Sequence, residues 1–235
     1  MSRILNIETA TEICSVCIAE GGKILAVRET SEGRNHAVSL AVFIRDIFND
    51  TGLKADDLDA VAVSMGPGSY TGLRIGVSTA KGICYAAGLP LLAVNSLESM
   101  FTGMLRTLHS KDESIPRNSL FLPMIDARRM EVYTAGFNQK GETELETHAL
   151  VVKEDSFIGL LKEHHLYLFG SGADKLVILP KHTNLRKIVG FSLSSVWMIP
   201  LSEKKFDKQQ FEDLAYFEPF YLKDFITTVP KKKLF

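Results

Sequence analysis

The residues best placed for chemistry lie in the glycine-rich segment 64–76, which reads SMGPGSYTGLRIG. A run that predicts a buried strand precedes the segment, and a run that predicts a helix follows it. A glycine turn between a strand and a helix binds phosphate, because free N–H groups and the positive end of the helix dipole face the anion. The spacing nevertheless fits neither standard phosphate motif. GxGxxG needs a glycine one residue before Gly72, and the Walker loop needs lysine and serine or threonine where this chain has Leu73 and Arg74.

Four further residues are candidates for holding a magnesium–nucleotide complex. Glu8 and Asp126 each end an apolar run that predicts a strand, and carboxylates are preferred ligands of Mg²⁺. Gly170 and Gly172 lie in a glycine turn before a short helical run, where they would contact an adenosine. The turns after the two acids contain no glycine. For Glu8 we therefore favour a second interpretation, in which its carboxylate caps a turn by accepting backbone N–H groups.

Residues for hydrolytic, redox or metal chemistry form no recognisable site in the sequence. The six histidines make neither HExxH nor HxxxH, and GxSxG is absent. Cys14 and Cys17 have CxxC spacing, but they lie in a predicted strand, where a three-residue separation directs side chains to opposite faces. We therefore predict buried reduced thiols, no catalytic residues and no metal ligands in this chain.

The elements that position these residues form two similar series. In the first half, the apolar pattern predicts helices over 35–50 and 73–88 and strands over 3–8, 13–19, 23–29, 58–64 and 91–94. The second half restarts in the same order, with strands over 121–126 and 131–137, and continues with a strand over 164–170 and a helix over 207–217. This order predicts an α/β protein with two related lobes of mixed sheets flanked by helices, which is the actin-like (ASKHA, ribonuclease H-like) fold.

Loss of apolar periodicity divides the chain between these two series. We predict an N-terminal lobe with partner-binding helices over 1–104, a connecting segment over 105–119, and a second lobe with a basic tail over 120–235. The tail, residues 229–235, is expected to be a solvated end rather than an RNA contact.

The two helices of the first half carry more apolar surface than one sheet requires. The first is apolar on most sides, and the second has small residues every four positions, a stripe that lets another helix approach closely. We therefore predict a partner interface, in which a bulky residue at Gly76 or Ala80 blocks the partner and leaves the chain folded. The alternative is that both helices are buried inside one domain. The predicted interface residues are His36, Leu40, Phe43, Ile44, Ile47, Gly72, Gly76, Ala80 and Cys84, with Gly88 ending the stripe.

Composition places the chain among ordinary globular proteins. It has 235 residues, of which 46% are hydrophobic and 23% charged, with a formal net charge of −1. So small a charge creates no global field that would recruit nucleic acid. We expect no signal peptide, no membrane span and a cytoplasmic location.

Several motifs of the chain closely resemble those of the bacterial TsaB (YeaZ) family. The resemblance runs to about residue 222 and is carried by the segment 66–76 with Ala80-Lys81-Gly82, and also by residues 9–12, His36, 125–129 with 131–133, and 219–222. It implies an actin-like fold and similarity to TsaD, the catalytic subunit that makes N6-threonylcarbamoyladenosine at position 37 of tRNAs reading ANN codons. It further implies a non-catalytic scaffold or dimerisation subunit that pairs with a TsaD-like protein through the two N-terminal helices.

The same resemblance sets expectations for ligands and partners. A TsaE-like ATPase joins the complex, tRNA is reached through the complex, and the chain is a homodimer when alone. ATP with Mg²⁺ and a metal ion belong to the partner subunits, and this chain needs no cofactor of its own.

Two departures bear on chemistry. Ser96 and Met100 stand where the catalytic subunit has metal-binding histidines, and Glu8 stands where the family usually has aspartate. The alternative function is an actin-like phosphotransferase of the acetate- or sugar-kinase type using ATP and Mg²⁺, whereas a metallopeptidase lacks its ligands.

Overall fold

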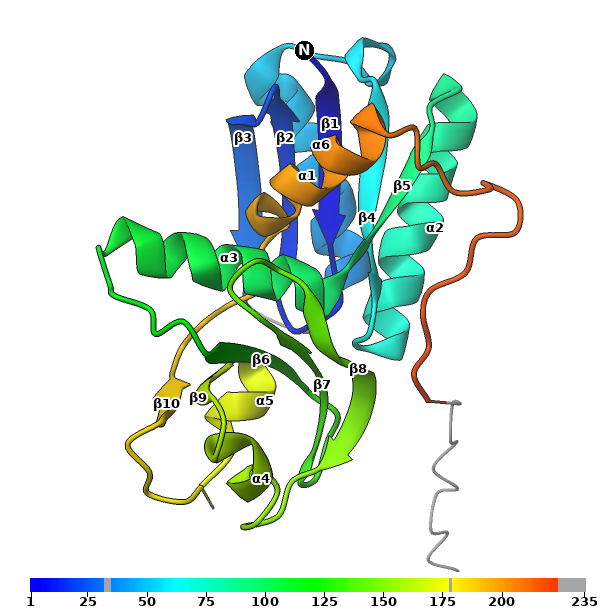
Figure 1. Ribbon diagram of the computed structural model, residues 1–235. Helices are drawn as coiled ribbons and strands as arrows, with labels where there is room; N and C mark the ends of the chain where they lie inside the picture. The colour runs from blue at the N-terminus through cyan, green and yellow to red at the C-terminus, as the bar shows by residue number, and fades with distance from the viewer. Residues whose placement is uncertain (32–34, 178, 224–235) are drawn as a thin grey trace, which may run out of the picture.

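The computed structural model describes residues 1–31, 35–177 and 179–223, so the basic tail predicted over 229–235 lies outside the described residues. Figure 1 shows two lobes stacked on one another, each built on a five-stranded sheet. Strands and helices alternate in both lobes, which confirms the predicted α/β class with mixed sheets.

The first lobe is a mixed sheet in the order β3-β2-β1-β4-β5. Strands β1, β4 and β5 run parallel, and β2 and β3 are antiparallel to their neighbours. Its strands are β1 (Arg3–Glu8), β2 (Cys14–Glu20), β3 (Lys23–Thr30), β4 (Ala60–Gly66) and β5 (Leu91–Asn95). Two long helices, α1 (His36–Thr51) and α2 (Tyr70–Ala87), cover one face of this sheet, and a short 3₁₀ helix, Ala55–Asp57, precedes β4.

The second lobe repeats the same topology in the order β10-β9-β6-β7-β8. Each of its strands has a counterpart in the first lobe with the same neighbours and directions. The sequence predicts the strands over 121–126, 131–137 and 164–170 and misses those at 143–151 and 185–188. Its strands are β6 (Ser119–Asp126), β7 (Glu131–Phe137), β8 (Thr143–Val151), β9 (His165–Phe169) and β10 (Leu185–Ile188). The helices equivalent to α1 and α2 are single turns here, α4 (Ile158–Leu161) and α5 (Ser171–Asp174).

The lobes are joined by an exchange of equivalent helices. The helix after β5 is α3 (Ser96–Ser110), and it packs on the second sheet against Phe121 and Phe137. The helix after β10 is α6 (Ile199–Asp207), preceded by a 3₁₀ turn (Ser195–Met198), and both pack on the first sheet against Ile4 and Leu92. Figure 1 shows α6 in orange lying across β1 and β4, and α3 in green lying between the lobes.

This exchange corrects the predicted domain boundaries. Helix α3 runs through the boundary placed at 104/105, so only residues 111–118 connect it to β6. Residues 195–207 belong by packing to the first lobe, because their apolar side chains cover its open face. The helix predicted over 207–217 is also wrong, since the helix ends at Asp207.

The last described residues form an extended C-terminal strap, 211–223. It pairs Glu212 with Leu91 on the edge strand β5, and the N–H of Phe220 donates to the carbonyl of Met65, 2.7 Å away. The Nζ of Lys81 on α2 donates to the carbonyls of Ala215 and Phe217, at 3.2 and 3.1 Å. Figure 1 shows the strap, in orange-red, descending beside α2.

Candidate functional site

Glu8 ends β1 and is fully buried at the start of the β1–β2 turn. Its Oε1 accepts the N–H of Ala10 at 2.6 Å, while Oε2 has no hydrogen-bond partner among the described residues. Burial raises the pKa of Glu8 to about 7, although the Ala10 hydrogen bond lowers it in part. The carboxylate therefore caps a turn, the interpretation favoured from sequence.

Asp126, the equivalent acid of the second lobe, is exposed at the end of β6. Its Oδ1 accepts the N–H of Arg128 at 2.7 Å and pairs with the ammonium of Lys175. The carboxylate is thus already neutralised by the chain's own cation, and its role toward nucleotide stays a prediction.

Gly170 and Gly172 hold the α5 turn against the neighbouring strand β6. Gly170 has a φ of +94°, and a Cβ there would lie 2.6 Å from the carbonyl oxygen of Met124. At Gly172 a Cβ would lie 2.9 Å from the Met124 carbonyl carbon. Close packing of the turn accounts for both glycines.

The glycine-rich segment 64–76 packs against the β1–β2 turn. The N–H of Ser69 donates to the carbonyl of Ala10 at 2.7 Å. A Cβ on Gly72 would lie 2.1 Å from the Thr9 carbonyl oxygen, and one on Gly76 would lie 2.2 Å from Thr9 Oγ1. The loop and the first half of α2 are therefore seated on the first lobe's own backbone.

This seating corrects the predicted partner stripe on α2. Gly72, Gly76, Ala80 and Cys84 are all buried against the lobe's own β-sheet and turns, so none is accessible to a second helix in the isolated chain. Gly88 ends the helix in the left-handed conformation, with φ of +66°. Small residues at four-residue spacing here admit the chain's own turn and sheet.

The predicted interface residues of α1 also face inward. Leu40 and Ile47 are fully buried in the core, and Phe43 and Ile44 are half-buried against it. His36 turns toward the β1–β2 turn, where its Nε2 lies 2.9 Å from the Thr11 carbonyl oxygen.

The outward sides of α1 and α2 carry other residues, most of them small or apolar. We call this surface the α1–α2 face and define it by the exposed residues Val38, Ala41, Gly82, Tyr85 and Ala86. Val38 is 62% exposed and Tyr85 84% exposed, and no charged residue occurs in α1 before Arg45. Sequence periodicity misses this surface because α1 is apolar on both sides; the absence of charge over 37–44 is the signal that could have found it.

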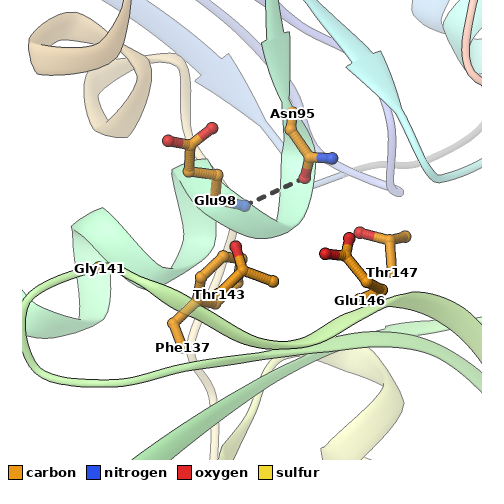
Figure 2. Close-up of a pocket in the computed structure, with 7 residues that line it drawn as sticks. All are labelled: Asn95, Glu98, Phe137, Gly141, Thr143, Glu146 and Thr147. Carbon is orange, nitrogen blue, oxygen red and sulfur yellow. Dashed lines mark hydrogen bonds between the residues drawn. The ribbon is translucent and has the colours of Figure 1, made fainter.

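A hollow of about 200 Å³ lies between the start of α3 and the β7–β8 hairpin, and Figure 2 shows the residues that line it. Asn95 Oδ1 accepts the N–H groups of Leu97 and Glu98, at 2.9 and 3.2 Å, and so caps α3. The Glu98 carboxylate points away from Glu146 across the hollow (Figure 2), so the two acids do not converge on one ligand. Met100, on the next turn of α3, is buried in the core.

A second hollow, of about 400 Å³, lies between α2 and the C-terminal strap. Within it the ring centres of Tyr70 and Tyr221 lie 4.8 Å apart with the rings tilted by 37°, and the Arg74 guanidinium lies 5.5 Å from the centre of the Tyr70 ring. Its other lining residues are Val77, Ser78, Lys81, Phe217, Glu218 and Pro219.

The three cysteines are buried and free, as predicted. Cys14 packs with the α1–α2 side of the sheet and Cys17 with the α6 side, and burial raises their pKa values to about 11 and about 12. Within residues 1–31, 35–177 and 179–223, no three His, Cys, Asp or Glu side chains are grouped as metal ligands. A search of the same residues for a helix long and apolar enough to cross a membrane finds none.

Comparison with known proteins connects this geometry to a family. The family model described as "TsaD: tRNA N6-adenosine threonylcarbamoyltransferase" matches residues 24–225. The chain is 36% identical over 137 residues to the tRNA threonylcarbamoyladenosine biosynthesis protein TsaB of Escherichia coli, covering 58% of this chain and 55% of that protein. It is 33% identical over 137 residues to TsaB of Bacillus subtilis, covering 58% and 56%. The match thus spans little more than half the length of these curated relatives.

A solved structure extends the likeness to most of the chain. YeaZ from Pseudomonas aeruginosa superposes with a TM-score of 0.77 at 25% identity, covering 94% of this chain and 100% of that one. The predicted two-lobed, actin-like fold is confirmed, and so is the resemblance to the TsaB (YeaZ) proteins.

Proposed function

Because the chain belongs to the TsaD family of tRNA N6-adenosine threonylcarbamoyltransferases, we propose that it acts in forming threonylcarbamoyladenosine in tRNA. Its role is that of a non-catalytic scaffold or dimerisation subunit, working with a TsaD-like catalytic subunit and a TsaE-like ATPase. The modified base is adenosine 37 of tRNAs that read ANN codons. The bacterial relatives are named for this biosynthesis. The similarity of this chain to about half the length of each relative supports the assignment.

The α1–α2 face carries the proposal. Val38 and Tyr85 expose apolar surface on adjacent helices of one lobe, and such surface is stabilised when a partner excludes water from it. The partner on this face is the TsaD-like subunit, or a second copy of the chain when that subunit is absent.

The acids at the strand ends support an accessory role. Glu8 is buried, with one carboxylate oxygen bonded to its own turn, and Asp126 is paired with Lys175. The chain therefore works without nucleotide or metal of its own, and ATP, Mg²⁺ and a metal ion belong to the partner subunits. We place the complex in the cytoplasm.

A phosphotransferase is the rival function, and calorimetry separates the two. Titrating the purified chain with ATP and Mg²⁺ should give no micromolar binding. Micromolar affinity together with phosphate transfer by the chain alone would favour the rival.

Reconstitution tests the proposal directly. The full chain is combined with the TsaD-like and TsaE-like proteins of the same organism, unmodified tRNA, ATP and an activated threonylcarbamoyl donor, and the modified nucleoside is measured by mass spectrometry. Val38→Asp, which places a charge on the α1–α2 face, should abolish co-purification with the TsaD-like protein and lower product formation more than tenfold.

Val189→Asp is the matched control, because Val189 is also highly exposed, at 71%, but lies after β10 in the second lobe. It should assemble and support modification like the native chain. Full assembly of the Val38→Asp variant, or product formed equally well without this chain, would overturn the proposal.

A further inference from the structure

The turn between β6 and β7 presents two adjacent arginines in an unusual conformation. Arg128 and Arg129 have φ values of +69° and +51°, a backbone region that glycine or asparagine adopts at lower cost than arginine does. The turn is closed by the Arg128 N–H on Asp126 and by the Glu131 N–H on the Arg128 carbonyl, 3.2 Å away. Both arginine side chains are exposed, so packing does not account for the residue type.

The two carboxylates beside these arginines are already paired with lysines. Asp126 pairs with Lys175 from the α5 turn, and Glu131 pairs with Lys223 at the end of the C-terminal strap. Within the part of the chain that the structure describes, neither Arg128 nor Arg129 has an ion pair or side-chain hydrogen bond. Among the described residues, the two arginines and two lysines against two paired carboxylates give this turn an excess of two positive charges.

Aromatic side chains continue the charged surface toward the first lobe. The half-buried Tyr133 on β7 lies within electrostatic reach of Lys223 and Arg128. Tyr221, two residues before Lys223, packs its ring in a tilted arrangement against Tyr70 of α2. The strap thus joins the arginine turn to the hollow beside α2.

Guanidinium groups with flanking tyrosines suit RNA in particular. Arginine binds phosphate oxygens in a bidentate manner, and tyrosine rings stack on unpaired bases such as those of an anticodon loop. The net charge of the chain is only −1, so a local patch of this kind must supply the attraction.

We infer that the Arg128–Arg129 turn binds the phosphate backbone of the tRNA on which the complex acts. The inference rests on the proposed function, which supplies the tRNA, and it assigns this chain a direct RNA contact.

The test measures tRNA affinity of the assembled complex as a function of salt concentration. Arg128→Asn with Arg129→Asn removes both guanidinium groups and keeps a residue that tolerates the left-handed backbone. Affinity at moderate salt should fall about tenfold, and the slope of log K against log salt should decrease by about 1 to 2. Each single variant should give roughly half of the slope change, and the melting temperature of the variants should match or exceed that of the native chain.

The matched control is Lys162→Asn with Lys181→Asn, which removes the same charge from exposed positions elsewhere in the second lobe. It should leave the salt slope unchanged. If the arginine variant keeps the affinity and slope of this control while the native complex modifies tRNA, the inference is overturned and the proposed function stands.

Two further outcomes are also decisive. Loss of co-purification with the catalytic partner at an unchanged salt slope would assign the arginines to a protein contact and overturn the RNA inference. A native complex that neither assembles nor modifies tRNA would overturn the proposed function, and the inference with it.

Discussion

Glu8 shows how one buried carboxyl couples the β1–β2 turn to pH. Its folded pKa of about 7 lies above the ordinary value of 4.5, so the folded chain holds a proton that the unfolded chain releases. The contribution of Glu8 to the free energy of unfolding is therefore fully present below about pH 4.5 and is lost as the pH rises through about 7. The charged form is disfavoured because burial removes the carboxylate from water, and the hydrogen bond from the Ala10 N–H offsets this only in part.

Glu8→Gln should remove this dependence, because the amide stays neutral at every pH. Relative to the native chain, the free energy of unfolding of the variant should rise by about 2 kcal/mol between pH 5 and pH 8. Denaturant titrations at several pH values measure the difference. Glu154→Gln, at an exposed position, is the control and should give a flat difference. If the difference in free energy of unfolding between Glu8→Gln and the native chain is also independent of pH, the Glu8 carboxyl does not hold a proton in the folded chain.

At the residue scale, features that depend on neighbours close in the sequence could be predicted. The opposed cysteines follow from strand periodicity, and the cap at Glu8 spans only two residues, to Ala10. The left-handed conformation of the Arg128–Arg129 turn was not predicted, because arginine as a residue type gives no signal for a left-handed backbone.

At the element scale, the small residues of helix α2 indicate that another part of a protein packs closely against it. They do not indicate which part that is. The stripe from Gly72 to Cys84 faces the chain's own turn and sheet, while a Cβ added to Gly82 on the outward side would meet nothing within 4 Å. The expectation that a bulky residue at Gly76 would block only a partner therefore fails, because the space there is filled by Thr9.

Gly72→Ala and Gly82→Ala should consequently have opposite effects. The first forces a methyl group to 2.1 Å from the Thr9 carbonyl oxygen and should lower the free energy of unfolding by about 1–3 kcal/mol or more. The second adds a methyl group in open space within a helix and should raise it by about 0.5–1 kcal/mol. Denaturation midpoints of the two variants measure both effects. Equal stability of the Gly72→Ala variant and the native chain would show that the helix is not seated on the turn.

The whole molecule is held together by the reciprocal placement of α3 and α6. Each equivalent helix covers the sheet of the other lobe, and Trp197 before α6 packs on Gly103 of α3. The α1–α2 face lies on the other side of the first sheet from α6, so it stays open when the lobes are joined.

This arrangement predicts mutually exclusive assemblies on the α1–α2 face. Alone, the chain should sediment as a homodimer, and titration with the TsaD-like subunit should convert it into a complex of one copy of each. Analytical ultracentrifugation across the titration measures the species. A complex that holds the intact homodimer together with the catalytic subunit bound to the same copies would show that the two partners use different surfaces.

The sequence by itself determined the strands of the first lobe and the restart of the same order in the second lobe, because apolar runs and turns are local patterns. It missed the second-lobe strands at 143–151 and 185–188. It also determined that no imidazole stands at positions 96 and 100. Only the tertiary structure decided which side of α1 and α2 faces outward and which sheet α6 covers. Those outcomes depend on contacts between residues far apart in the chain, such as Thr9 with Gly76 and Ile4 with Met198, and residue spacing is compatible with either side.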